Sequence, residues 1–216
     1  MSGPLLQAAS QHIVERQRAL LASGVDAEYR DVNGWTALHH AACGTGGIDT
    51  AADAAALIAA GVPVDATTHQ GSTALHLATR RRSYNDDPRG RLGMVRALIA
   101  AGADVNCANV HGRTPLLIAL CEDECGMLKT LLRAGAALDR SVLNHFFDAY
   151  ASFYYFYEHH PAFDLADSIV KMGGWDEYAR RRRETLVGVV GKCTRGAVPD
   201  VVVAEIAAFV SPPGGH

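Results

Sequence analysis

The sequence predicts an all-α solenoid in which stacked helix pairs are joined by β-turn fingers and followed by a C-terminal helical extension. The first observation behind this prediction is a pattern that recurs three times: two glycines flank a turn, and a Thr with a Leu two places on follows. The copies of its second half are WTALHHAA (35–42), STALHLAT (72–79) and RTPLLIAL (113–120). The second observation is that each copy ends in an aliphatic pair and then a Gly, at Gly61, Gly102 and Gly135. A unit that recurs in this way is typical of a stacked array, because each unit buries its apolar face against its neighbours.

The residue types predict two helices in each unit. A Thr before an apolar segment can cap a helix N-terminus through its hydroxyl, so we expect a first helix after Thr36, Thr73 and Thr114. The aliphatic pairs predict a second helix. It should end at the following Gly, because the residue after a helix often takes a left-handed conformation.

The three units, written in full, resemble the ankyrin repeat. They read GVDAEYRDVNGWTALHHAA (24–42), GVPVDATTHQGSTALHLAT (61–79) and GADVNCANVHGRTPLLIAL (102–120). The signature of that family is T-P-L-H-x-A after a β-turn, within a repeat of about 33 residues. His39 and His76 occupy the His position of the signature, and Leu117 replaces it in the third unit. The resemblance implies an ankyrin-repeat solenoid that is a non-catalytic protein–protein interaction module, with a partner protein bound in a concave groove.

The repeat register also predicts the domain organisation. The stretch from Pro4 to Gly24 has the length of the helix pair in a full unit, which indicates a first repeat that lacks its β-turn. After the signature is lost, the segments 141–157 and 163–174 still predict a helix pair that ends in Gly, which indicates one more, degenerate unit. The predicted parts are an N-terminal capping repeat at 1–31, three repeats at 32–140, a degenerate fourth repeat at 141–174 and the helical extension at 175–216.

The resemblance implies where a partner protein would bind. In ankyrin repeats the turn residues and the exposed side of each first helix line the groove. Carried over to this sequence, the partner-binding positions are Val32, Asn33, Trp35, His40, His69, Gln70, Ser72, Leu77, Arg80, Val110, His111, Arg113 and Ile118. We expect Trp35 to contribute most, because Trp is enriched at interface hot spots and a position beside a turn gives it little core to occupy. The alternative is that it packs against the neighbouring turn.

Longer spacings between units predict two inserted loops, at 43–50 and 80–92. The second loop is rich in arginine: Arg80, Arg81, Arg82, Arg89 and Arg91. These guanidinium groups would suit an acidic or phosphorylated partner, whose carboxylates or phosphates match the Arg fork. The other interpretation is a solvated loop whose charges are neutralised within the molecule by Glu122, Asp123 and Glu124.

Composition argues against several function classes. The net charge of −3 at pH 7 argues against a nucleic-acid partner, which requires a basic surface. No apolar run is long enough to span a bilayer, so we expect no membrane partner. The ten His and five Cys residues show no zinc-ligand spacing and no phosphate-binding loop is present, so we predict no catalytic residues, no metal and no cofactor. The lack of a signal-peptide pattern and the odd number of cysteines predict a cytoplasmic or nuclear protein, and we expect a monomer.

The segment VPDVVVAEIAAFV (198–210) predicts an amphipathic helix near the C-terminal end. It resembles the leading helix of an F-box, or the related box of many viral ankyrin proteins. This resemblance implies an alternative function, the substrate-recognition subunit of a ubiquitin ligase. The residues that would dock the ligase adaptor are Pro199, Val202, Ile206, Phe209 and Val210. The other interpretation is that these helices only cap the C-terminal end of the array.

Overall fold

The computed structural model describes residues 4–10, 19–20, 22–43, 50–81, 88–144 and 161–181. The chain divides into two compact units, Met1–Ala137 and Leu138–His216. The described residues contain helices and turns and no β-strand, which confirms the all-α prediction.

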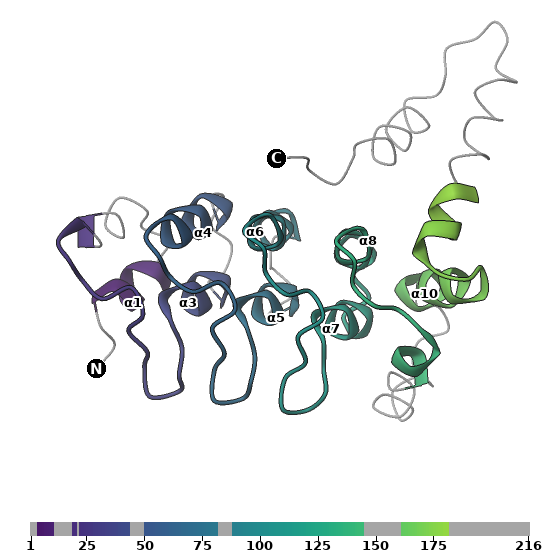
Figure 1. Ribbon diagram of the computed structural model, residues 1–216, viewed down its shortest axis with the longest axis horizontal. Coiled ribbons are helices and arrows are strands. Elements are labelled where there is room, and N and C mark those ends of the chain that lie inside the picture. Colours follow the sequence, from purple (N-terminus) through teal and green to yellow (C-terminus); the bar gives the residue numbers. More distant parts are fainter. Residues whose placement is uncertain are drawn as a thin grey trace, which may run out of the picture. The chain divides into compact units, whose positions relative to one another are not determined.

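In the first unit the helices form two rows that run side by side (Figure 1). Each helix contacts the next in its own row, and the paired helices α3 and α4, α5 and α6, and α7 and α8 also contact each other. The first-helix row consists of α1 (Pro4–Ser10), α3 (Ala37–Cys43), α5 (Ala74–Thr79) and α7 (Pro115–Cys121). The second-helix row consists of α4 (Thr50–Ala59), α6 (Pro88–Ala100) and α8 (Cys125–Arg133).

The interfaces between repeats are made of the Leu and Ala residues of the repeated pattern. Leu38, Leu75 and Leu116 are at most 1% exposed, and the alanines three places after each are also buried. Small side chains at these positions allow the short first helices to approach closely, while each leucine fills the space between neighbours. The apolar surface that each repeat would expose alone is removed from water by the next repeat, and the array is stable only as a stack.

The helix ends follow the predicted residue types. Thr114 Oγ1 accepts a hydrogen bond of 3.2 Å from the backbone N–H of Leu117, and Pro115 is the first residue of α7. Gly61, Gly102 and Gly135 have φ angles of 89°, 87° and 90°, so each second helix ends at a left-handed glycine.

The predicted loop at 80–92 is wrong in its second half. Helix α6 begins at Pro88, so Arg89 and Arg91 lie on its first turns and not in a loop. The physical reason is that Pro fits the first turn of a helix, where no N–H is needed and its fixed φ angle is already helical. Residues 82–87 of this insertion and 44–49 of the other lie outside the described residues.

The second unit contains α10 (Pro161–Lys171), with helical residues also at 140–144 and 175–181. Helix α10 buries Ala162, Phe163, Ala166 and Ile169, which lie on one face of a helix. Glu177 pairs with Arg180 at 2.7 Å and with Arg181 at 2.6 Å. The assignment of 141–174 as a degenerate fourth repeat, and of 175–216 as a separate extension, stays a prediction.

Candidate functional site

Three loops of the first unit project from the first-helix row and have the same construction (Figure 1). We call residues 31–35, 68–72 and 109–113 the fingers. In each finger the first residue donates its backbone N–H to the carbonyl oxygen of the last, at 2.9, 2.9 and 3.0 Å. The Gly before the last residue donates its N–H back to the carbonyl oxygen of the first, at 2.9 Å in all three fingers. Each finger is therefore closed by backbone hydrogen bonds alone.

The side chain of the first finger residue adds a second set of bonds. Asp31 Oδ1 accepts from the N–H groups of Asn33 and Trp35 at 2.8 and 2.9 Å. Thr68 Oγ1 and Asn109 Oδ1 accept from the corresponding N–H groups of their own fingers, at 3.2–3.3 Å and 2.9–3.1 Å. These three residues are not among the predicted site residues. The available signal was an oxygen-bearing side chain three places before a Gly, a pattern typical of turns that are closed by a side chain.

Neighbouring fingers are also joined to each other. The N–H of His69 donates to the carbonyl oxygen of Asn33, and that of Val110 to the carbonyl oxygen of Gln70, both at 3.1 Å. The first finger approaches the second so closely that position 34 requires glycine. A Cβ added to Gly34, whose φ is +77°, would lie 2.9 Å from His69 Cδ2 and 3.1 Å from its backbone N. The three fingers thus form one continuous row with a fixed spacing.

Two buried histidines tie each first helix to the following finger. Nδ1 of His39 accepts from the N–H of Thr36 at 3.1 Å, so the proton of the neutral ring is on Nε2. Nε2 then donates to the carbonyl oxygen of Ser72 at 3.1 Å, and His76 donates in the same way to Arg113 at 3.0 Å. Burial lowers the pKa of His39 to about 4 and also lowers that of His76, so both rings are neutral at pH 7.

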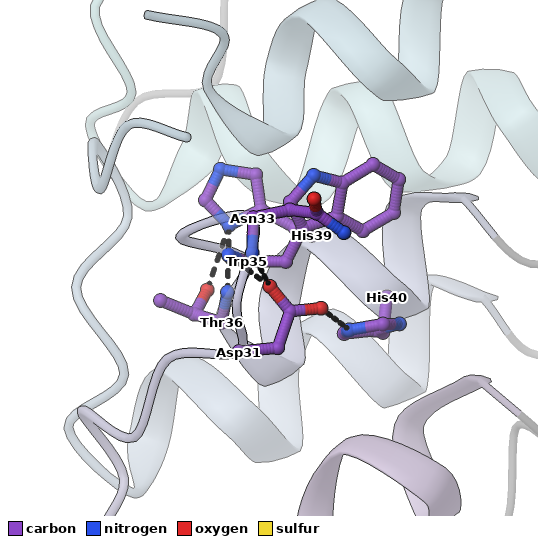
Figure 2. Close-up of polar contacts among 6 residues, drawn as sticks. All are labelled: Asp31, Asn33, Trp35, Thr36, His39 and His40. Carbon is purple, nitrogen blue, oxygen red and sulfur yellow. Dashed lines mark hydrogen bonds and ion pairs between the residues drawn. The ribbon is translucent and has the colours of Figure 1, made fainter. Parts of the chain in front are cut away.

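Trp35 is half-buried and lies against its own helix. Its ring centroid is 5.1 Å from that of His40 and 6.3 Å from that of His39. Figure 2 shows Asp31 between the finger backbone and His40, whose Nε2 lies 3.1 Å from Asp31 Oδ2. Burial alone would raise the pKa of Asp31, but hydrogen bonds from Trp35, Asn33 and His40 outweigh it and the pKa is lowered. Trp35 therefore packs against two imidazole rings of α3 and stays half-buried.

None of the thirteen predicted partner-binding residues is buried. Val32 and Val110 are 85% and 64% exposed at the finger tips. Six further polar residues are exposed: Asn33, His69, Gln70, Arg80, His111 and Arg113. The half-buried members are Trp35, His40, Ser72, Leu77 and Ile118. The fold places nine of these residues on the finger row, and the other four on α3, α5, α7 or directly after α5. Their role in binding stays a prediction.

The arginines after α5 are partly neutralised within the molecule. Arg91 Nη2 lies 2.5 Å from Glu124 Oε1, and both side chains are less than 20% exposed. Burial raises the pKa of Glu122, while Arg80, Arg91 and Arg81 act in the opposite direction. The interpretation of internal charge pairing therefore holds for Arg91, and Arg80 stays exposed beside Glu122.

Other kinds of site find no support in the described part of the chain. No group of three or more His, Cys, Asp or Glu side chains is placed there to hold a metal ion. No described helix combines the length and apolar character needed to cross a bilayer. The residues that would dock a ligase adaptor, Pro199, Val202, Ile206, Phe209 and Val210, lie outside the described residues.

Comparison with known proteins agrees with the geometry of the repeats. The family described as "Ankyrin repeats (3 copies)" matches residues 5–87 and 54–141. Half of the chain is similar to Neurogenic locus Notch protein of Drosophila melanogaster, with 36% identity over 120 residues and 4% of that protein covered. It is also similar to Neurogenic locus notch homolog protein 1 of Mus musculus, with 37% identity over 124 residues and 5% of that protein covered. The chain therefore spans about one twentieth of the length of these relatives.

The family match covers more than half of the chain, and the described helix pairs, fingers and inter-repeat histidines have the order that the signature requires. These observations make the chain a protein–protein interaction module. The chain belongs to the ankyrin-repeat family.

Proposed function

We propose that this chain is a non-catalytic adaptor that binds a partner protein across the finger row and the adjoining side of the first helices. The observation that carries the proposal is a rigid frame with exposed tips. Every finger is closed by its own hydrogen bonds and is bonded to the next, while Val32 and Val110 keep 85% and 64% of their surface exposed. Large apolar side chains held in this way are typical of binding surfaces.

The hydrogen-bonded finger backbones also reduce the entropic cost of binding a partner. A loop that must become ordered on binding loses conformational entropy, which subtracts from the affinity. The fingers are already ordered, because the side chains of Asp31, Thr68 and Asn109 hold their backbones. A partner would therefore meet prepositioned side chains. Trp35 stands among them with its ring oriented by His40.

Affinity purification of the full chain with Val32→Asp and Val110→Asp tests this proposal. Each substitution places a charge on an exposed apolar tip and leaves the hydrogen bonds of the finger intact, because none of them uses the side chain of Val32 or Val110. The matched control is Ala55→Asp, since Ala55 is exposed on α4 in the second-helix row. Partners captured by the wild type and by the control should be lost with the finger variants. Equal capture by all variants would place the binding surface elsewhere.

The second hypothesis, a ubiquitin-ligase substrate receptor, is supported by the sequence pattern of residues 198–210 alone. It requires the helix that contains Pro199 and Val210 to dock an adaptor of the Skp1 type. Co-purification of that adaptor with the full chain, and its loss from a chain that ends at Lys192, would support the hypothesis. Partner capture through the fingers that persists in the shortened chain without any adaptor would remove it.

A further inference from the structure

We propose that the segment bound on this surface is an extended, acidic stretch of the partner protein that also carries apolar side chains. In this arrangement its carboxylates lie against Arg113 and its apolar side chains against Trp35, Leu77 and Ile118. The proposal rests on the proposed function, because it names the chemistry of the partner that the finger row would select.

The first argument is the distribution of charge along the loops that carry the fingers. The chain as a whole has a net charge of −3. Four exposed acidic side chains of the first unit lie before the fingers, at Asp26, Glu28, Asp65 and Asp104, and a fifth, Asp123, follows α7. The thirteen surface residues include two arginines and three histidines and no acidic residue. The same loops are therefore acidic where they leave the second helices and neutral or basic at their tips.

Three acidic residues of the fingers and of the turn after α7, namely Asp31, Glu122 and Glu124, have their charge engaged. Asp31 uses Oδ1 for the N–H groups of Asn33 and Trp35 and Oδ2 for His40. Glu122 lies half-buried among Arg80, Arg81 and Arg91. Glu124 is paired with Arg91. The carboxylates of Asp31, Glu122 and Glu124 therefore face groups of this chain and do not repel an acidic segment bound on the fingers.

Arg113 is the cation best placed to meet a carboxylate. It ends the third finger and its side chain is exposed. Its backbone is fixed on both sides, since its N–H binds Asn109 Oδ1 and its carbonyl oxygen accepts from His76. Among the described residues no hydrogen bond or ion pair is recorded for its guanidinium group. A planar guanidinium held in this way can bind a carboxylate through two parallel hydrogen bonds.

The apolar part of the surface comes from the last residue of the first finger and from the first helices α5 and α7. Trp35, Leu77 and Ile118 come from consecutive repeats, and each is half-buried, so one side of each remains accessible. The fingers lie side by side in the first unit (Figure 1). A segment that contacts both Trp35 and Arg113 must cross all three repeats. An extended chain spans the most distance per residue, about 3.3 Å, which favours it over a helix for this path.

Selection of displayed 12-residue peptides of random sequence on the full chain tests the proposal. The enriched peptides should be rich in Asp or Glu together with aliphatic or aromatic residues. Arg113→Glu should weaken their binding about tenfold or more, and Arg113→Lys should weaken it less. The matched control is Arg96→Glu, the same change of charge at an exposed position on α6, which should leave binding within about twofold.

The outcomes separate this proposal from the one on which it rests. Enriched peptides that are neutral or basic, yet are lost with Val32→Asp and Val110→Asp, would overturn the acidic segment and leave the finger surface intact. Enriched peptides that survive every finger substitution would overturn both. Enrichment that requires phosphoserine in place of Asp or Glu, or tight binding of a single-stranded oligonucleotide that Arg113→Glu abolishes, would also overturn the acidic segment.

Discussion

His39 on α3 donates its Nε2 proton to the carbonyl oxygen of Ser72, the last residue of the second finger, at 3.1 Å. Its Nδ1 holds the N–H of Thr36 at the start of its own helix. One imidazole ring thereby joins the beginning of one repeat to the finger of the next. His76 makes the same connection to Arg113, and Leu117 in the third repeat cannot. The signature histidine is therefore a buried link between repeats.

Replacing His39 with Leu should destabilise the array by about 1–3 kcal/mol, because the N–H of Thr36 and the carbonyl oxygen of Ser72 each lose a buried or half-buried partner. Leu is the residue that the third repeat carries at the equivalent position, so the size of the side chain is tolerated by the fold. Urea unfolding followed by circular dichroism measures the change. His111→Leu is the control, since His111 is exposed and should shift stability by less than about 0.5 kcal/mol. Equal effects of the two variants would contradict the role assigned to His39.

Stability should fall as the pH is lowered from 6.5 to 4. Burial lowers the pKa of His39 from the ordinary value of 6.5 to about 4, so in this range the unfolded chain binds a proton that the folded chain does not. The contribution is fully present above pH 6.5 and is lost on approach to pH 4. It amounts to at most about 3 kcal/mol for a shift of this size. Urea unfolding at several pH values should give a steeper decline for the wild type than for His39→Leu. Parallel curves would show that another group is responsible.

Gly34→Ala should be more destabilising than Gly24→Ala. Both residues have positive φ angles, +77° and +83°, so both substitutions carry the conformational cost of about 1 kcal/mol. Only Gly34 has neighbours in the way: its new Cβ would lie 2.9 Å from His69 Cδ2, whereas nothing lies within 4 Å of a Cβ at Gly24. The difference in unfolding free energy between the two variants, about 1–2 kcal/mol, measures the packing between the first and second fingers. No difference would mean that His69 moves aside without cost.

Trp35→Ala should reduce partner binding about tenfold or more and also lower the melting temperature slightly. The loss of binding is expected because Trp residues at interface hot spots contribute a large share of the binding free energy. The loss of stability, about 1 kcal/mol, follows from its half-buried ring and its contacts with His39 and His40. Calorimetry and affinity measurements on the same samples separate the two effects. Val32→Ala is the matched control for stability, because Val32 is 85% exposed and its truncation should leave the melting temperature unchanged. Unchanged partner affinity in Trp35→Ala would exclude it from the binding surface.

The repeated elements were predictable from sequence because their causes are local. Thr114 caps α7 through an atom three residues from its partner, and Gly135 ends α8 because only its own φ angle matters. Leu38 and its counterparts lie at the interface because an apolar side chain at that position of every repeat has one place to be buried. Each of these features depends on a few consecutive residues, and the resemblance to a known repeat brings all of them together in one prediction.

The connections between repeats were not predictable in the same way. The bond from His69 N–H to Asn33, and the position of Trp35 against His40, depend on how the fingers stack and how the first helix turns beneath them. The start of α6 at Pro88 was missed because the arginines around it favoured a loop, although the proline itself indicated a helix N-terminus. The identity of the partner depends on surface side chains that the frame does not constrain.

The bonds that hold each finger use the side chain of its first residue and backbone groups elsewhere. The two tip positions, occupied by Val32 and Asn33, by His69 and Gln70, and by Val110 and His111, donate or accept through their main chain only in these bonds. Exchange of a tip side chain therefore leaves the scaffold almost untouched. In the proposed binding mode, the two residues at each tip can change with the partner, while the side chains of Asp31, Thr68 and Asn109 keep the finger backbones in place.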